Sequence, residues 1–283
     1  MQIIDAQVHI WGADTPQRPW PKRQAAHRPV PLGKDELLRE MDAAGVHAAI
    51  LVPPSWEGER NDLALEAVRQ HPDRFAVMGR LNTEAPGAAA QLETWKSQPG
   101  MLGLRMALLY APWQLPLLTE GKLDWFWPVA ERLDIPLMVL TAHSLIHYFE
   151  KIIARHPGLR IVMDHCALTP HTIDEEAFRD LDKLLALARL PNVMVKVSAL
   201  QCHTSEAYPY PTLQQHIRRV YDAFGPKRMF WGSDLSRLPC TYRQCVTTFT
   251  EEIPWLSNTD KELIMGRALS NWLRWKPAEI VTK

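Results

Sequence analysis

The sequence predicts a single (β/α)8 (TIM) barrel, and three observations support this prediction. Short apolar segments alternate with amphipathic segments of helical period along the chain. The apolar segments are continuous instead of alternating with polar residues, which is typical of parallel strands that are covered on both faces. The chain has 283 residues, and eight strand–helix units fit into roughly 250 residues in this fold. We therefore treat residues 1–283 as one barrel domain.

The first strand is predicted at residues 3–11, almost at the start of the chain. It places Gln7 and His9 on one face, two residues apart, because side chains alternate along a strand. The other seven strands are predicted at residues 47–52, 75–81, 102–108, 136–141, 160–165, 193–198 and 228–232.

The helices between these strands are placed by period and by their end signals. Gly45 is expected to end the first helix, and Asn61 is expected to act as the N-cap of the second. The predicted helices span residues 34–44, 61–70, 88–97, 123–133, 145–155, 175–189, 213–224, 242–251 and 261–272.

Residues 12–32 have no period of their own and are rich in Pro, Arg and polar residues. They leave the strand that carries His9, so they form either a lid over a site or a plain surface loop.

A doubly wound open sheet is the alternative fold. The turn after the first strand, Trp11-Gly12-Ala13-Asp14, lacks the Gly-rich phosphate loop that this alternative requires.

Composition narrows the classes of function. Lys and Arg together number 32, as do Asp and Glu, so no nucleic-acid partner is expected. No apolar segment is long enough to cross a membrane, and no signal peptide is apparent. The four cysteines show no metal-binding spacing. We expect a cytoplasmic protein with a small-molecule substrate, and the sequence leaves a homo-oligomer open.

Unusual polar residues lie at the carboxyl ends of five predicted strands, where side chains of a barrel converge on one pocket. Buried polar groups cost free energy unless they are paired, so coincidence is a poor explanation for five such strands. The residues are Asp5, Gln7, His9, Arg105, Asp164, His165, Lys196, Ser198 and Asp234.

Several of these residues also have a structural interpretation. Asp164 and His165 are adjacent, so strand alternation predicts that only one faces inward, and we favour His165. Gln7 can bind a neighbouring strand instead of a ligand. Lys196 and Arg105 can form ion pairs inside the barrel instead of binding substrate.

Two further residues are candidates for the pocket wall. His143 follows the fifth strand and Trp11 ends the first.

The chemistry that the whole set indicates is attack by water. A strand-end carboxylate such as Asp234 serves as general base or holds a metal, and a histidine polarises a carbonyl. A serine triad is excluded because the chain has no Gly-x-Ser-x-Gly elbow.

In their order along the chain, these residues resemble the amidohydrolase superfamily. The resemblance is to its amidohydrolase-related branch, which includes 2-pyrone-4,6-dicarboxylate lactonase and sugar-lactone hydrolases. It covers nearly the whole chain, and its motifs are Ile-Asp-Ala-Gln-Val-His9-Ile-Trp, Gly103-Leu-Arg105, the segment His156 to His165, Val-Lys196-Val-Ser198 and Trp231-Gly-Ser-Asp234.

The resemblance implies a hydrolase that opens a lactone of a small carboxylated or polyhydroxylated substrate. His9, His165 and Asp234 are then catalytic, and the same three residues are the ligands if a metal binds. Gln7 replaces the first histidine of the family's His-x-His pair, and the fifth strand lacks the histidine of zinc-dependent members. We therefore expect no cofactor or one weakly held Zn or Mn ion.

The substrate-binding residues expected from this comparison are Gln7, Arg105, Lys196, His143 and Trp11. Two other functions stay open from the sequence. One is a metal-dependent decarboxylase or hydratase of an unsaturated acid. The other is a catalytically inactive barrel that binds a small ligand, which the presence of Gln7 favours.

Overall fold

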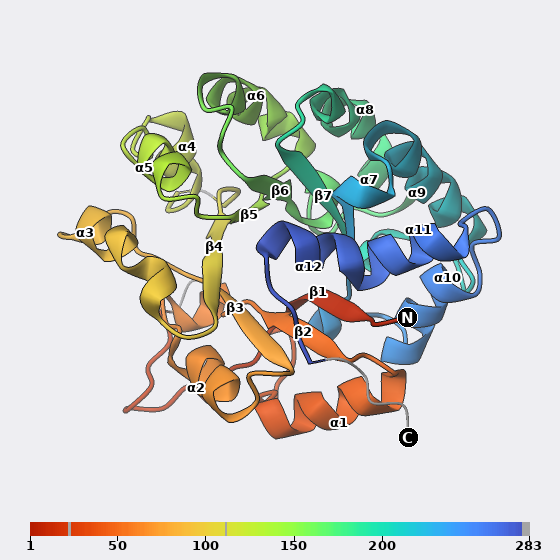
Figure 1. Ribbon diagram of the computed structural model, residues 1–283, viewed down its shortest axis with the longest axis horizontal. Helices are drawn as coiled ribbons and strands as arrows, with labels where there is room; N and C mark the ends of the chain where they lie inside the picture. Colours follow the sequence, from red (N-terminus) through yellow and green to blue (C-terminus); the bar gives the residue numbers. More distant parts are fainter. Residues whose placement is uncertain (22–23, 111, 279–283) are drawn as a thin grey trace.

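The eight predicted strands all form, and they lie in one parallel sheet in sequence order (Figure 1). The computed structural model describes residues 1–21, 24–110 and 112–278. The strands are β1 (Ile4–Val8), β2 (Ala48–Leu51), β3 (Phe75–Gly79), β4 (Met101–Ala107), β5 (Leu137–Leu140), β6 (Ile161–Met163), β7 (Val193–Ser198) and β8 (Met229–Gly232).

Helices surround the sheet, and the barrel prediction is confirmed. They are α1 (Lys34–Ala44), α2 (Asp62–Gln70), α3 (Ala88–Glu93), α4 (Leu115–Thr119), α5 (Phe126–Arg132), α6 (Ile146–Arg155), α7 (Asp174–Phe178), α8 (Leu181–Leu185), α9 (Pro211–Phe224), α10 (Tyr242–Thr250), α11 (Asn258–Glu262) and α12 (Ala268–Leu273). The short helix α4 was not predicted. The single helix predicted at 175–189 is divided into α7, α8 and a 3₁₀ turn.

The last predicted helix, 261–272, is also interrupted. A π-type turn at Leu263–Arg267 separates α11 from α12. A Cβ on Gly266 would lie 2.8 Å from the carbonyl oxygen of Gln2 and 3.2 Å from the backbone nitrogen of Ile4. The helix therefore widens where it touches the backbone beside β1, and only glycine fits this approach.

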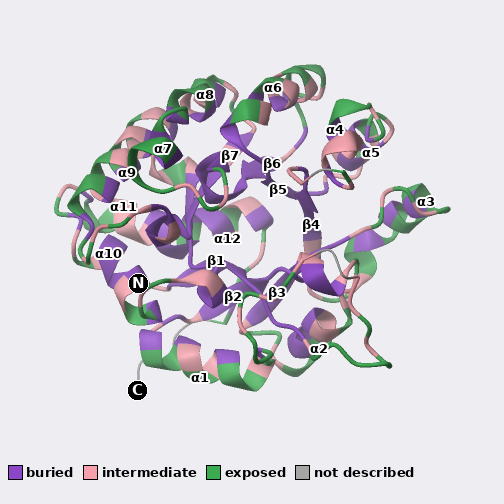
Figure 2. Ribbon diagram, turned by 180° about the vertical axis from the view of Figure 1, so that it is seen from behind, coloured by how far each residue is buried: buried purple, intermediate pink, exposed green. Residues whose placement is uncertain are grey.

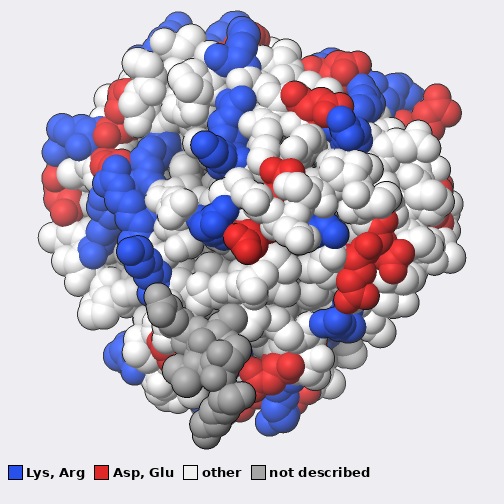
Figure 3. Space-filling view, turned by 45° about the vertical axis from the view of Figure 1, so that its right-hand side comes forward, with Lys and Arg blue, Asp and Glu red and all other residues white. Residues whose placement is uncertain are grey.

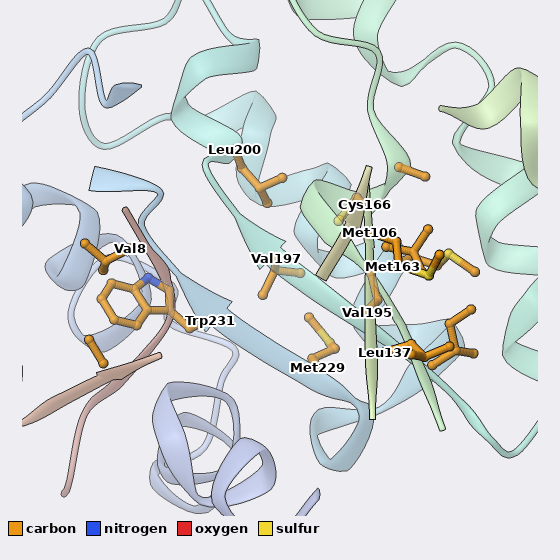
Figure 4. Close-up of a cluster of buried hydrophobic side chains, with 14 of the residues drawn as sticks. Val8, Met106, Leu137, Met163, Cys166, Val195, Val197, Leu200, Met229 and Trp231 are labelled. Atoms are coloured by element: carbon orange, nitrogen blue, oxygen red, sulfur yellow. The ribbon is translucent and has the colours of Figure 1, made fainter. Parts of the chain in front are cut away.

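Two apolar layers hold the barrel together. The outer layer lies between strands and helices, and Figure 4 shows part of it, including Met163, Val195 and Trp231. The inner layer fills the barrel and includes Ile4 and Phe230, together with Leu269 of α12. Helix α12 lies across the barrel in Figure 1, so it closes one end of the interior. The strands are buried along almost their whole length (Figure 2), and only Leu102 of β4 and Met194 of β7 are partly exposed.

The junction between β8 and β1 is completed by a buried side chain. Asp5 Oδ1 accepts hydrogen bonds from the backbone nitrogens of Gln7 and Ser233, both at 2.9 Å. Asp5 Oδ2 accepts a hydrogen bond from the Tyr242 hydroxyl at 2.7 Å. A Cβ on Gly232 would approach Asp5 Oδ1 to 3.2 Å, so glycine leaves room for this carboxyl group. Asp5, which the sequence placed among the site candidates, therefore connects the first and last strands.

One capping prediction is confirmed for the position of the residue but not for the role of its side chain. Asn61 occupies the N-cap position of α2, but its side chain makes no capping hydrogen bond. Instead, its Nδ2 donates to the carbonyl of Arg80 at 2.9 Å and its Oδ1 accepts from the backbone nitrogen of Arg80 at 2.8 Å. The chain just beyond β3 offers this pair of unpaired backbone groups, and they outcompete the helix end for the amide.

The surface carries both signs of charge. Figure 3 shows basic and acidic side chains scattered over the face in view, with uncharged surface between them. Among the described residues, no helix is both long enough and apolar enough to cross a membrane.

Candidate active site

A cavity of about 390 Å³ lies at the carboxyl ends of the strands. His9, His165 and Asp234 all line it, so the structure brings together three predicted residues that lie just beyond the ends of β1, β6 and β8. Arg105 from β4 lines it as well. This is the end of a barrel at which strand-end side chains converge.

Asp234 is at the centre of the arrangement. Its Oδ1 lies 3.1 Å from Nε2 of His9, and its Oδ2 lies 3.6 Å from Nε2 of His165 and 3.5 Å from Nη1 of Arg237. Burial alone would raise the pKa of this carboxyl group, but His9, Arg237 and His165 outweigh it and hold the pKa well below its ordinary value. Asp234 is therefore an ionised carboxylate at neutral pH.

The hydrogen bond of His9 to the main chain fixes one of its protons. Nδ1 of His9 lies 2.6 Å from the carbonyl oxygen of Val52, which can only accept, so Nδ1 donates. Its Nε2 faces Asp234 Oδ1, which has no hydrogen-bond partner of good geometry among the described residues. A neutral His9 would direct a lone pair at a carboxylate, which requires a proton or a cation between the two atoms.

The same reasoning applied to Gln7 assigns the protons of His165. Lys196 Nζ donates to Oε1 of Gln7, so the amide NH₂ of Gln7 faces His165 Nε2 at 3.3 Å. Nε2 of His165 then accepts, and its Nδ1 lies 2.8 Å from the Ser198 hydroxyl. Burial lowers the pKa of His165 to about 3, so its ring is neutral.

Asp164 belongs to this network as well, contrary to the expectation that only one residue of the Asp164–His165 pair faces inward. Its carboxylate lies 2.7 Å from Lys196 Nζ and 3.3 Å from Arg105 Nε. Strand β6 ends at Met163, and His165 has a left-handed φ of 51°. Strand alternation therefore does not apply to the pair, and both side chains turn inward.

Asp164 compensates two buried cations. Burial alone would raise its pKa, but Lys196 and Arg105 hold that pKa below the ordinary value. Burial lowers the pKa of Lys196, and Asp164 opposes this effect. The side chains of Lys196 and Asp164 are both 0% exposed, so each depends on the other for compensation of its charge.

Four of the predicted substrate-binding residues do not line the cavity. Gln7 and Lys196 lie beneath it in the network just described. His143 is buried and its Nε2 lies 2.9 Å from the carbonyl oxygen of Cys166, while Trp11 packs edge-on against Trp56 at 5.3 Å. Of the five predicted residues, the structure places only Arg105 against the cavity. The roles of the other four in substrate binding remain predictions.

The segment 12–32, of which residues 22–23 lie outside the described part, runs over the cavity. Residues 24–27 line it, and Nδ1 of His27 lies 2.8 Å from the Ser236 hydroxyl. The ring of His27 also packs against Trp56 at 4.5 Å. This position agrees with the lid interpretation. His27 was not predicted, because an aperiodic loop gives no signal of where its side chains point.

Arg237, Tyr110 and His171 are further lining residues that the sequence reasoning missed. Arg237 follows Asp234 by three residues in the 3₁₀ turn Leu235–Arg237. That spacing places Arg237 one turn after Asp234 and on the same side of the turn. The sequence could therefore have indicated that Arg237 lies at the cavity. Tyr110 and His171 lie in loops and had none.

One divalent metal ion would find three donors in this cavity. His9, His27 and Asp234 each offer an atom, and these atoms lie within 4.8 Å of one another. The unpartnered Oδ1 of Asp234 and the outward-facing Nε2 of His9 fit a cation, with His9 oriented by a main-chain carbonyl as metal-binding histidines usually are. His165, the third ligand expected from the sequence, is not in this group, and its Nε2 faces the amide of Gln7.

Comparison with known proteins places the chain in a family. The amidohydrolase family model matches residues 4–270. The chain belongs to the amidohydrolase family. The match covers all eight strands and the three residues around which the cavity is built.

Two curated relatives are similar over most of their length. An L-fucono-1,5-lactonase from Burkholderia ambifaria is 28% identical over 253 residues, which cover 83% of this chain and 81% of that protein. A 4-sulfomuconolactone hydrolase from Hydrogenophaga intermedia is 24% identical over 249 residues, which cover 81% of this chain and 73% of that protein.

Solved structures share the fold. An amidohydrolase from Burkholderia multivorans with bound zinc superposes with a TM-score of 0.82 at 22% identity, covering 97% of this chain and 100% of that one. A probable 2-pyrone-4,6-dicarboxylic acid hydrolase from Acinetobacter baumannii, with citric acid bound, gives 0.79 at 20% identity with the same coverage.

Proposed function

We propose that this amidohydrolase opens the ring of a lactone by attack of water on the ester carbonyl. The observation that carries the proposal is the buried, ionised Asp234 at the wall of a cavity, with His9 and His165 on its two oxygens. Support comes from the two curated relatives, both of which are named for lactone hydrolysis.

In this reaction Asp234 accepts a proton from water as the water oxygen bonds to the carbonyl carbon. The ring C–O bond then breaks, and the proton passes to the departing ring oxygen, which gives a hydroxy acid. The low pKa of Asp234 keeps it ready as an acceptor. A carboxylate with a low pKa is a weak base and activates water poorly by itself. Hydrogen-bond donors must therefore polarise the carbonyl oxygen at the same time.

Arg105 and Arg237 are better placed for that polarisation than His165. Both arginines line the cavity, and a guanidinium group can only donate. Nε2 of His165 accepts from Gln7, and the His165 ring is neutral. With no proton on Nε2, His165 can neither polarise a carbonyl oxygen from that atom nor donate to Asp234. This refines the expectation from the sequence that both histidines polarise the carbonyl.

The charges around the cavity favour an anionic substrate. The cationic side chains here outnumber the carboxylates by one, which leaves room for a negative group of the ligand. The three cations are Arg105, Lys196 and Arg237, and the two carboxylates are Asp164 and Asp234.

The decisive experiment is Asp234→Asn, assayed by proton release over a panel of carboxylated and sugar lactones. Turnover should fall by about 10²–10⁴-fold, which is the usual contribution of a general base. Asp222→Asn on the outer helix α9 is a matched control that should keep full activity, because Asp222 is exposed and its ion pair in the described part of the chain is with Arg218, on the same helix. A folded Asp234→Asn variant with wild-type turnover removes Asp234 from this role.

Metal-dependent decarboxylation is the second candidate, and the His9, His27 and Asp234 group favours it. A Zn or Mn ion held there would supply a Lewis acid. Metal analysis of the purified protein, together with carbon dioxide release from unsaturated acids, separates the two reactions. Stoichiometric metal and carbon dioxide release without lactone hydrolysis would favour decarboxylation. Ligand binding without either reaction would indicate an inactive barrel.

A further inference from the structure

A second cavity, of about 170 Å³, lies beside the first. It is bounded by the chain that follows β3, by β4 and by α4 and α5. The residues that matter here are Glu59, Arg80, Arg105, Gln114, Leu117 and Phe126. Arg105 lines this cavity and also the larger one that contains Asp234. The two spaces therefore share one guanidinium group as part of their walls.

Arg80 gives the second cavity a buried cation with a free donor. The residue is 4% exposed. Its Nε and Nη2 donate to the two oxygens of Glu59 at 3.0 and 3.2 Å. Its Nη1 is buried and has no hydrogen-bond partner among the described residues. Leaving a buried donor without a partner costs free energy, so this position favours an acceptor atom supplied by a ligand.

The position of Arg80 is held from two directions. The side chain of Asn61 bonds both the backbone nitrogen and the carbonyl of Arg80, and Glu59 fixes the guanidinium plane. The pair with Glu59 is bidentate, and such pairs have a defined orientation. The unpartnered Nη1 is therefore held in place before a ligand arrives.

Arg105 adds a second cation at the same place. It lies on β4, and β3 pairs with β4 so that Gly79 is opposite Leu104, which makes Arg80 and Arg105 the next residues along the two strands. Burial lowers the pKa of Arg105, and the charge of Arg80 lowers it further. Two like charges this close repel each other, and a shared anion relieves the repulsion.

We propose that this second cavity is a subsite for a carboxylate of the substrate, bound by Nη1 of Arg80, while the ester carbonyl lies in the larger cavity. Arg105 lies between the two groups. The inference rests on the proposed function for the orientation of the substrate, and it narrows the substrate class to lactones that carry a carboxylate on an arm away from the reacting ester.

The test measures binding directly, so its outcome does not depend on turnover. Calorimetric titration compares the monomethyl esters of succinate, glutarate and adipate, which keep one carboxylate, with the corresponding dimethyl esters on the wild-type protein. We expect at least one monomethyl ester to bind tenfold or more tightly than its dimethyl ester. Arg80→Gln should abolish this preference and leave the affinity for the dimethyl ester within twofold of the wild type.

A second variant covers the case in which Arg80→Gln does not fold. Leu117→Trp keeps Arg80 but fills the cavity from α4, and it should abolish the same preference. Arg132→Gln, on the exposed side of α5, is the matched arginine control and should bind as the wild type does. Thermal unfolding verifies the fold of each variant.

The outcomes separate this inference from the proposed function. Equal binding of monomethyl and dimethyl esters by the wild-type protein overturns the subsite, as does an unchanged preference in both folded variants. If the variants lose the preference but the wild-type protein hydrolyses no lactone, the subsite is retained and the proposed lactonase activity is rejected.

Discussion

The amide nitrogen of Gln7 lies 3.3 Å from Nε2 of His165, and this contact decides what His165 can do. Lys196 binds the other end of the amide, so Gln7 cannot turn over and offer its oxygen to the histidine. Nε2 of His165 is thus occupied as an acceptor. Gln7 therefore supplies no imidazole of its own and also occupies Nε2 of His165.

The first prediction follows from this contact. Gln7→His should tighten zinc binding by about tenfold or more, since it adds an imidazole and releases Nε2 of His165. Competition with a chromophoric chelator measures the affinity. Gln7→Leu releases Nε2 without adding a ligand, so it should fall between the wild type and Gln7→His. Unchanged zinc affinity in folded Gln7→His would show that the contact does not limit metal binding.

The second prediction concerns Asp164, which pairs with two buried cations. Asp164→Asn should lower the free energy of unfolding by about 3–5 kcal/mol, because it leaves Lys196 and Arg105 without a compensating charge. Urea denaturation measures the loss. The double variant Asp164→Asn, Lys196→Met should recover part of it, since one uncompensated cation is removed. A double variant no more stable than the single one would contradict this charge balance.

The sequence was sufficient for the barrel because its signals are local and repeated. Continuous apolar strands and amphipathic helices alternate, and the strand ends necessarily meet at one end of a barrel. That is why His9, Arg105, His165 and Asp234 could be placed together before any geometry was known. The helix interruption at Gly266 could not be placed in this way, because its cause is contact with the backbone beside β1.

The missed parts of the site depend on contacts distant in sequence. Strand alternation predicted that Asp164 faces away from the site, but the strand ends one residue before Asp164, so the alternation does not extend to it. His27 reaches the cavity through a loop fixed by Ser236, more than 200 residues away. The pairing of Lys196 with Asp164 depends on the register of β6 with β7. None of these contacts leaves a pattern along the chain.

The third prediction is a pH effect on stability. His203 is buried, its Nδ1 lies 2.8 Å from the carbonyl oxygen of Thr172, and burial lowers its pKa to about 4 from an ordinary value of 6.5. Between these values the unfolded chain binds a proton that the folded protein does not, so stability falls as the pH drops from 6.5 towards 4.

Urea denaturation at pH 7 and pH 5 measures this effect. His203 should account for on the order of 1–2 kcal/mol of the loss. His203→Gln should be less stable than the wild type at pH 7 but should lose less stability on acidification. An equal loss in the wild type and His203→Gln would mean that His203 takes up its proton in the folded protein as readily as in the unfolded chain.

The last prediction tests whether the loop over the cavity contributes to a metal site. His27 and His171 are both exposed histidines on the cavity wall, but only His27 lies with His9 and Asp234 within 4.8 Å. His27→Ala should therefore weaken zinc or manganese binding by about tenfold or more, whereas His171→Ala should leave it unchanged. Chelator competition measures both affinities without reference to turnover. If both substitutions weaken metal binding equally, the histidines act through the overall charge of the cavity and His27 is not a specific ligand. If neither does, the ion is held from the strands alone and the loop only covers it.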